Sequence, residues 1–340
     1  MQYNMKKNFQ AVFMALVVAI SGMFTVSGGE KYEEVNEEWQ HAILAAVDSF
    51  PENGGYYTGR NSTKDFPRTA WRAMNEAFGM RPSDMVPVLD MKKAQPSFCS
   101  SATYMAFLKG LKIWDEGNDE ETISNLSWFY LKPYCGVTDL VNSQGYNQDD
   151  GEGFWGMANA NGPGMAVLVK ESDAGFSFMG YRGAKTEKYR ENDDEVYMTD
   201  EQWRNDPVWR YARKGDFMKI FWNRNETDNS DSGAIIGVNS NPSDEQEHGH
   251  SVIFLGYDDL GNVIYWSSNG PGENPKEMGY GVATCDKLRI QRVVFTRITK
   301  PEKFTNIKKS KANKKHEWLN SLAGKHHGTT KELKKYCGID

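Results

Sequence analysis

The 340-residue sequence lacks the features that mark several classes of protein. It contains four cysteines, too few for a disulfide scaffold at this length, so a hydrophobic core must hold the fold. The net charge of −6 provides no general nucleic-acid-binding surface, and no nucleic-acid partner is expected. No internal repeat is evident. An apolar content of 39% predicts one large core or two modest ones rather than a disordered chain.

The apolar run near the N-terminus is too short to span a membrane comfortably. Lys6 and Lys7 precede the run Ala11–Ile20, and small residues follow it as far as Gly28. This order of basic, apolar and small segments predicts a secretory signal peptide over residues 1–29. We therefore expect a secreted or periplasmic protein, with an uncleaved N-terminal anchor as the alternative.

Helical patterns come before strand patterns along the chain. Helices are predicted over residues 34–50, with Asn36 as N-cap, and over 66–78, 94–111 and 120–131. Strands are predicted over 165–171, 175–183, 215–223 and 288–298, together with a hairpin over 249–270. This order indicates an α+β fold in which helices pack on an antiparallel sheet.

Composition divides the rest of the chain into two parts. Residues 30–300 are predicted to form one domain with N-terminal helices, in which the polar stretch from Thr186 to Pro207 is an insertion or surface loop. Residues 301–340 are rich in lysine and are predicted to be a C-terminal extension. Such a run could hold an anionic surface by charge, although it is more often simply solvated.

Cys99 is the candidate nucleophile. It falls in the first turn of a helix for which Ser97 is the predicted N-cap, and a helix N-terminus favours the thiolate. A nucleophilic thiol also needs an imidazole beside it. Of the six histidines, only His248 and His250 lie next to a strongly predicted strand. We favour His250 because the sequence around His248 is typical of a loop.

Asn269 is the candidate for orienting the His250 ring. The strand that starts at His250 turns back into a second apolar strand, which ends at Asn269. The amide oxygen of Asn269 could accept the imidazole N–H, and Ser267 is the weaker candidate. An oxyanion formed in acyl transfer needs donors, for which we predict the backbone N–H of Cys99 and the side chain of Gln95.

Each of these residues also has an ordinary structural interpretation. A lone cysteine in an amphipathic helix is more often a core residue than a nucleophile. His248 and His250 could instead bind a metal, but the sequence offers no third or fourth ligand, so neither a metal nor a cofactor is expected. Residues 228–233 have the composition of a calcium loop but lack its closing glutamate, and are more typical of a turn.

Aromatic residues among glycines are the candidate ligand-binding surface. Phe154, Trp155 and Tyr181 could line a cleft for a peptide or a sugar. Core packing beneath a loop is at least as common a role for such residues.

The other three cysteines are assigned structural roles. Cys135 and Cys337 have similar flanking residues and could pair in an exported protein, although sequence alone does not decide this. Cys285 is interpreted as structural or disulfide-bonded.

The arrangement resembles that of the papain-like cysteine hydrolases. Those proteins also place a cysteine at a helix start, then Gly-His leading a strand, then asparagine at the end of the next strand. Within the group, KGDFMKIFW followed by GHSVIFLGYDDLGNVIYWSSN is most similar to the NlpC and CHAP families. The resemblance implies a papain-like, NlpC-like fold with Cys99 as nucleophile, His250 as base and Asn269 as orienting residue. It also implies cleavage of amide bonds in peptidoglycan peptides through a thioester, without metal or cofactor.

Other functions are compatible with the same residues. A papain-like protease acting on proteins would use the same groups, as would an acyltransferase of the transglutaminase kind. A catalytically silent module could instead hold wall fragments or a partner in the aromatic cleft, and the basic tail could contact the cell wall. The oligomeric state is not predicted.

Overall fold

The computed structural model describes residues 30–59, 61–80, 87–118, 122–133, 155–156, 163–184, 190–222, 249–270, 272–307, 318–319 and 328–340. The chain divides into two units, Met1–Glu34 and Val35–Asp340. The described part of the first unit contains the 3₁₀ turn η1 (Glu30–Glu33), and the predicted signal peptide lies outside the described residues. Within the described ranges, no helix is long and apolar enough to cross a membrane.

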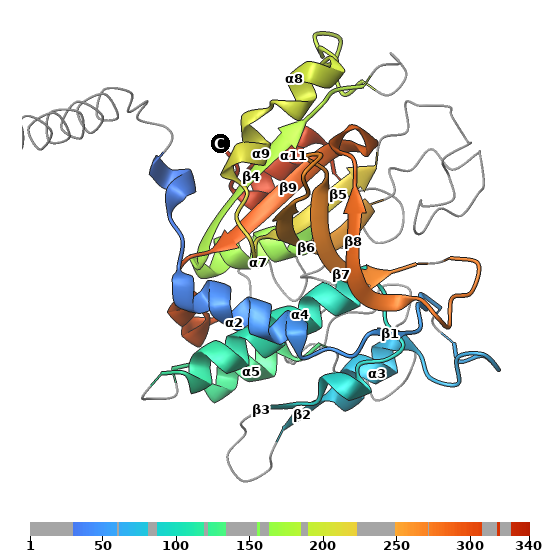
Figure 1. The fold of residues 1–340 in the computed structure, drawn as a ribbon. Helices are drawn as coiled ribbons and strands as arrows, with labels where there is room; N and C mark the ends of the chain where they lie inside the picture. The colour runs from blue at the N-terminus through green and yellow to red at the C-terminus, as the bar shows by residue number, and fades with distance from the viewer. Residues whose placement is uncertain are drawn as a thin grey trace, which may run out of the picture. The chain divides into compact units, whose positions relative to one another are not determined.

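The second unit is built on a seven-stranded antiparallel sheet, as the α+β prediction required (Figure 1). Its strands lie in the order β1-β8-β7-β6-β5-β9-β4. Their bounds are β1 (Asn53–Gly54), β4 (Gly175–Tyr181), β5 (Phe217–Trp222), β6 (Gly249–Tyr257), β7 (Val263–Asn269), β8 (Gly279–Cys285) and β9 (Ile290–Ile298). A separate hairpin pairs β2 (Phe78–Met80) with β3 (Pro87–Leu89). The sequence predicted β4, β5, β6, β7 and β9 of this sheet. It did not predict the glycine-rich β8.

Helices and 3₁₀ turns surround this sheet. They are α2 (Glu37–Asp48), α3 (Ala70–Ala77), η2 (Met91–Lys93), α4 (Cys99–Glu116), α5 (Asn125–Leu131), α7 (Pro163–Ser172), α8 (Asp200–Arg204), α9 (Pro207–Tyr211), η5 (Lys287–Arg289), η6 (Pro301–Asn306) and α11 (Thr330–Cys337). The prediction for α2 is confirmed with its cap, because Asn36 Oδ1 accepts the backbone N–H of Trp39 at 2.9 Å. Predicted helices at 66–78 and 120–131 are present but shorter.

Two predictions of local structure were wrong. Residues 165–171 were predicted as a strand and instead belong to α7, which starts at Pro163. A short run of buried apolar residues has no polar face, so its periodicity cannot separate a strand from a buried helix. In the predicted loop from Thr186 to Pro207, Thr199 caps α8 and Trp203 is fully buried.

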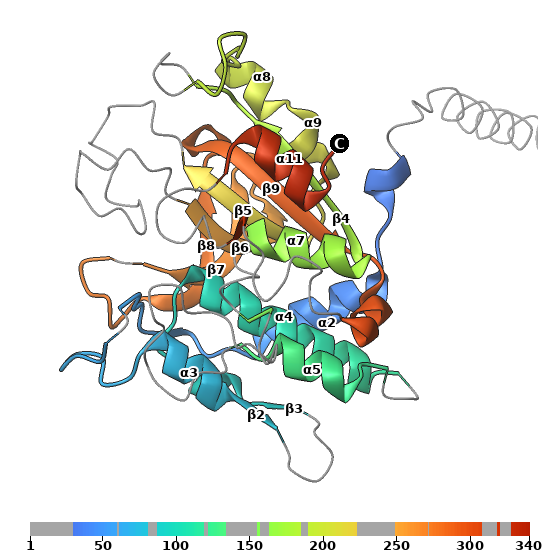
Figure 2. The same cartoon turned by 180° about the vertical axis from the view of Figure 1, so that it is seen from behind.

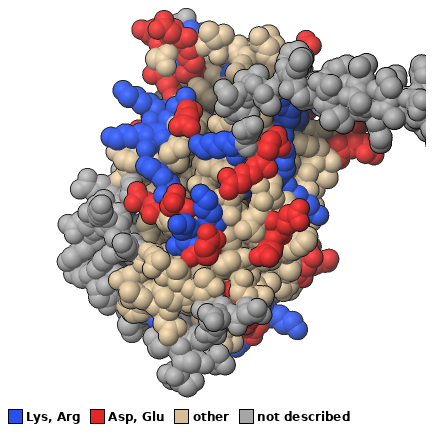
Figure 3. Space-filling view, turned by 90° about the vertical axis from the view of Figure 1, so that its left-hand side faces the viewer, with Lys and Arg blue, Asp and Glu red and all other residues tan. Residues whose placement is uncertain are grey.

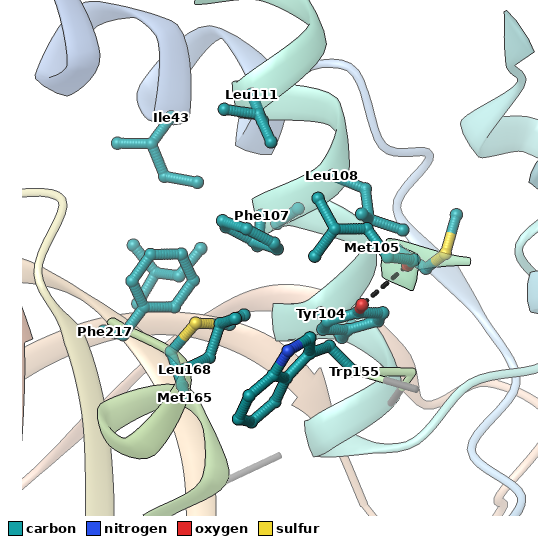
Figure 4. Packing of buried hydrophobic residues seen from close by; sticks show 14 of the residues in the cluster. Ile43, Tyr104, Met105, Phe107, Leu108, Leu111, Trp155, Met165, Leu168 and Phe217 are labelled. Atoms are coloured by element: carbon teal, nitrogen blue, oxygen red, sulfur yellow. Dashed lines mark hydrogen bonds between the residues drawn. The ribbon is translucent and has the colours of Figure 1, made fainter. Parts of the chain in front are cut away.

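The helix that begins at Cys99 packs on the sheet. Helix α4 contacts β6 and β7, and α2 packs against α4 (Figure 1). Figure 4 shows the apolar contact, in which Phe107 of α4 lies between Ile43 of α2 and Phe217 of β5. The rings of Phe107 and Phe217 meet edge to face at 6.2 Å. This packing fixes the helix, and with it the position of Cys99, against the strands that carry His250 and Asn269.

The opposite face of the sheet is buried as well. Trp209 and Phe254 both meet Phe295 of β9 edge to face, and Phe178 stacks on Phe295. Every residue of β9 is buried as a result, and these residues include the polar Gln291, Arg292, Thr296 and Arg297.

The lysine-rich C-terminal region contributes to the same core. Phe304, Leu333 and Cys337 are buried in the cluster that contains the side chains of α4 and α7. Figure 2 shows α11 beside α7 on the face of the sheet formed by β9 and β4. The predicted boundary at residue 300 therefore does not mark the end of the hydrophobic core.

Candidate active site

Cys99 is the first residue of α4. The preceding residue, Phe98, is extended, with φ −145° and ψ 168°, and acts as the N-cap residue. Its backbone N–H donates to the hydroxyl of Ser101 at 2.8 Å, and this hydroxyl donates back to the Phe98 carbonyl at 2.7 Å. The N–H of Cys99 itself has no acceptor within the helix, because the first four N–H groups of any helix lack one.

Ser97 is not the N-cap that was predicted. Its hydroxyl donates to Ser268 of β7 at 2.8 Å. The helix starts one residue later than the prediction required, and Ser97 ties its entry to the strand residue next to Asn269.

His250 lies near the start of β6 and is 1% exposed. Its ring is packed between Trp222, which stacks on it at 6.2 Å and 24°, and Tyr265, which meets it at 5.5 Å and 78°. These two aromatic side chains restrict the ring to one plane.

The His250 ring is oriented by Asn269, as predicted from the hairpin. His250 Nε2 lies 3.2 Å from Asn269 Oδ1. The amide nitrogen of Asn269 donates to the carbonyl of Gly281 on β8 at 2.9 Å, which fixes the amide with its oxygen toward the ring. Nε2 must then carry the hydrogen, so Nδ1 is the nitrogen available to Cys99. Ser267, the weaker candidate, donates instead to the carbonyl of Ser251 at 2.7 Å.

The thiol of Cys99 is half-buried and free, and its surroundings favour the thiolate. Burial raises the pKa of Cys99, but the hydrogen bond and charge of His250, the ammonium of Lys219 and the backbone N–H of Ser251 together lower it to about 6. An ordinary thiol has a pKa of about 8.5. Cys99 is therefore mostly ionised at neutral pH, which is the state that a nucleophile requires.

Tyr56 is a functional residue that the sequence did not predict. It is 7% exposed and is a neighbour of the Cys99 thiol. Burial and the neighbouring thiolate raise the pKa of Tyr56 well above its ordinary value, so the phenol stays protonated and can donate. Tyr56 reaches the site because its segment pairs with Ser97 in a parallel bridge. No local sequence signal reports such a bridge between distant segments.

Gly270, directly after Asn269, leaves room for the Tyr56 ring. A Cβ atom at Gly270 would lie 2.4 Å from Tyr56 Cγ. The two residues at the end of β7 therefore have separate roles. Asn269 orients the His250 ring, and Gly270, just after the strand, leaves space for the Tyr56 ring.

The described contacts of Gln95 are made with other residues than Cys99. Its side chain packs against Gly54, where an added Cβ atom would come within 2.4 Å of Gln95 Oε1, and its carbonyl accepts from the guanidinium of Arg68. Among the described contacts, no hydrogen bond joins Gln95 to Cys99. Tyr56 is a side-chain hydroxyl that the fold brings to the sulfur.

The predicted aromatic cleft is not formed by its two described members. Trp155 is 1% exposed and its side chain lies in the core below Tyr104 (Figure 4). Its backbone N–H donates to the Tyr130 carbonyl at 2.9 Å. Tyr181 is on β4, separated from β6 by β5 and β9, and its hydroxyl donates to Glu195 at 2.9 Å. Trp155 therefore has the core-packing role that the sequence also allowed. Phe154 lies outside the described residues.

The other chemical groups considered from sequence add no second centre. The described residues contain no cluster of His, Cys, Asp and Glu suited to a metal ion. Cys285 and Cys337 are buried free thiols, and burial raises the pKa of each to about 12. Cys135, His248 and residues 228–233 lie outside the described part of the chain. On the face drawn in Figure 3, acidic and basic side chains lie beside one another.

Comparisons with protein-family models, with curated proteins and with solved structures give no match to this chain.

Proposed function

We propose that this protein is a cysteine hydrolase that cleaves amide bonds through a thioester acyl-enzyme. One observation carries the proposal: the Cys99 thiol, with a pKa of about 6, meets a histidine whose other ring nitrogen is held by Asn269. A buried structural cysteine has no need of this arrangement. The two other described cysteines, Cys285 and Cys337, have pKa values raised to about 12.

The proposed reaction begins with attack of the Cys99 thiolate on the carbonyl carbon of an amide. Negative charge moves to the carbonyl oxygen, where the Cys99 backbone N–H and the Tyr56 hydroxyl are the candidate donors. The His250 imidazolium gives its Nδ1 proton to the departing amine as the C–N bond breaks, which leaves a thioester on Cys99. Water, deprotonated by the neutral His250, then attacks the thioester, and the thiolate leaves with the release of a carboxylic acid.

Asn269 takes no part in proton transfer in this scheme. Its amide oxygen accepts the Nε2 hydrogen in both protonation states of the ring, so Nδ1 continues to face the sulfur and the substrate. A carboxylate in that position would stabilise the imidazolium more strongly; an amide orients the ring without adding charge.

The substrate that we propose is the peptide of bacterial peptidoglycan. This choice is supported by the Gly-Asp strand followed by the Gly-His strand, a pattern that resembles the NlpC and CHAP families within the papain-like hydrolases. The basic, apolar and small segments of residues 1–29 support action outside the cytoplasm. A papain-like protease that cleaves proteins is the alternative within the same chemistry.

The test is the pH dependence of Cys99 alkylation by iodoacetamide in the purified protein. We expect an apparent pKa near 6, which should move toward the value of a free thiol, about 8.5, in His250→Ala. Cys99→Ser provides the blank for the other thiols. A reactive Cys99 would then be presented with defined wall peptides and with unfolded protein, and release of new amines would be measured. A thiol that titrates near 8.5 in the folded protein, or one indifferent to His250, would rule out the hydrolase.

A further inference from the structure

Ser97 is buried beside the proposed nucleophile and does not cap its helix. It lies two residues before Cys99 and is 1% exposed. A serine just before a helix commonly uses its hydroxyl to accept a helix N–H. At the start of α4 the hydrogen bonds are instead exchanged between the backbone of Phe98 and the hydroxyl of Ser101. The Ser97 hydroxyl is therefore left for a contact outside the helix.

The backbone of Ser97 holds the segment that carries Tyr56. The N–H of Ser97 donates to the carbonyl of Gly55 at 3.0 Å, and its carbonyl accepts the N–H of Tyr57 at 2.9 Å. Tyr56 lies between these two partners, so both hydrogen bonds fix the point at which its side chain leaves the backbone. Because Ser97 and Cys99 are two residues apart, the same hydrogen bonds set the position of Tyr56 relative to Cys99.

The hydroxyl of Ser97 reaches the other side of the site. It donates to the hydroxyl of Ser268 at 2.8 Å, and Ser268 is fully buried. Ser268 directly precedes Asn269, the residue that orients the His250 ring. One hydrogen bond therefore joins the start of α4, where Cys99 lies, to the end of β7.

We infer that Ser97 is a positioning residue whose hydrogen bond to Ser268 aligns the Cys99 thiol with the His250 ring. The inference rests on the proposed function, and Ser97 acts through Cys99 and Asn269 rather than on the substrate. Cys99 and His250 come from elements far apart in the chain, so their contact depends on how α4 lies against the hairpin of β6 and β7. A displacement of about 1 Å between reacting groups can lower a rate about 10²-fold.

Burial makes this hydrogen bond suited to fixing a position. Ser97 and Ser268 are 1% and 0% exposed, so neither hydroxyl can readily exchange its partner for bulk water. A buried hydroxyl left unpaired is costly, which favours the arrangement in which the two hydroxyls meet over arrangements in which α4 is displaced.

The first experiment is the pH dependence of Cys99 alkylation in Ser97→Ala, which needs no substrate. This substitution removes the hydroxyl and keeps both backbone hydrogen bonds of residue 97. We expect the apparent pKa of Cys99 to rise from about 6 toward that of a free thiol, about 8.5, because contact with His250 would be held for less of the time. For the peptide that the wild-type protein cleaves, kcat should fall about tenfold with little change in KM.

Ser177→Ala is the matched control. Ser177 of β4 forms a buried hydroxyl pair with Thr296 of β9 at 3.0 Å, and β9 and β5 separate β4 from β6. Loss of either hydroxyl pair should lower the melting temperature by a similar amount, about 2–4 °C. Only Ser97→Ala should also change the alkylation pKa and kcat, which a merely structural role would leave as they are.

Ser268→Ala removes the same hydrogen bond from its other side. Ser97→Ala, Ser268→Ala and the double variant should share one raised pKa of Cys99, because a single contact can be lost only once. Where Ser97→Ala does not fold, as thermal melting would show, Ser268→Ala makes the same test. Shifts that add in the double variant would show two independent effects and overturn the proposed link.

The outcomes separate this inference from the proposed function. A pKa of Cys99 that stays near 6 in folded Ser97→Ala, or one that rises equally in Ser177→Ala, would overturn the positioning role and leave the hydrolase intact. A wild-type pKa near 8.5 would instead refute the proposed function itself.

Discussion

Asn269 and His250 are joined by a hydrogen bond of 3.2 Å between Asn269 Oδ1 and His250 Nε2. The two residues come from neighbouring strands of one hairpin, and the Asn269 amide is fixed in turn by the Gly281 carbonyl. This chain of contacts sets both the tautomer and the plane of the ring, so the nitrogen nearest Cys99 is determined two strands away.

Replacing Asn269 by alanine should leave His250 without its orienting partner. We expect hydrolysis to fall about tenfold or more and the alkylation pKa of Cys99 to rise, because the Nδ1–thiolate contact would be held for less of the time. Ser267→Ala is the control, since Ser267 donates to the Ser251 carbonyl and not to the imidazole. Equal effects of the two substitutions would show that Asn269 has no special role.

Removing the Tyr56 hydroxyl should mainly affect the transition state. Tyr56→Phe keeps the ring that packs against Gly270 and removes the donor that faces Cys99. We expect kcat to fall about 10²- to 10³-fold, the usual effect of losing one oxyanion donor, with iodoacetamide still able to alkylate Cys99. Gln95→Ala tests the alternative donor and should cost less than Tyr56→Phe. The reverse order would restore the original assignment of Gln95.

The pH dependence of activity should follow the ionisation of Cys99. Because the thiolate forms as pH rises through a pKa of about 6, kcat/KM should increase up to that pH and fall about tenfold per unit below it. Substitution of His250 by alanine removes the largest of the effects that lower this pKa, so the acid limb should move to higher pH. An acid limb that His250→Ala does not move would contradict the ion pair.

The described thiols should react selectively. Burial raises the pKa of Cys285 and Cys337 to about 12, so neither should be alkylated in the folded protein at pH 7, whereas Cys99 should react. Peptide mapping by mass spectrometry after brief labelling measures this, and labelling in denaturant is the control. Modification of Cys285 at a rate similar to Cys99 would contradict the burial on which the pKa shift rests.

A buried ion pair supports the strand that precedes the histidine strand. Arg297 donates twice to Asp216, at 2.8 and 2.7 Å, and both side chains are almost fully buried. Arg297→Met would leave the Asp216 carboxylate buried and unpaired, so we expect the free energy of unfolding to drop by about 3–5 kcal/mol in denaturant titrations. The exposed pair Arg204–Asp286, also close at 2.6 Å, is the control, and Arg204→Met should cost about 1 kcal/mol or less.

Tertiary contacts rather than local sequence brought in the residues that the sequence did not predict. Tyr56 faces Cys99 through a bridge to Ser97, and Lys219 reaches the site across Gly249. Conversely, Trp155 and Tyr181 looked suited to a ligand but are engaged in the core and at a distant strand. Aromatic side chains among glycines occur in both settings, so composition could not distinguish them.

The sequence by itself determined the elements whose signals are local. The helix around Cys99, the hairpin from His250 to Asn269 and the capping of α2 by Asn36 all depend on side-chain periodicity, turn residues and caps within a few positions of one another. Only the tertiary structure decided which groups share the space around the sulfur and that residues 165–171 are helical. Those outcomes depend on burial between segments far apart in the chain, where packing outweighs the weak preferences of any short segment.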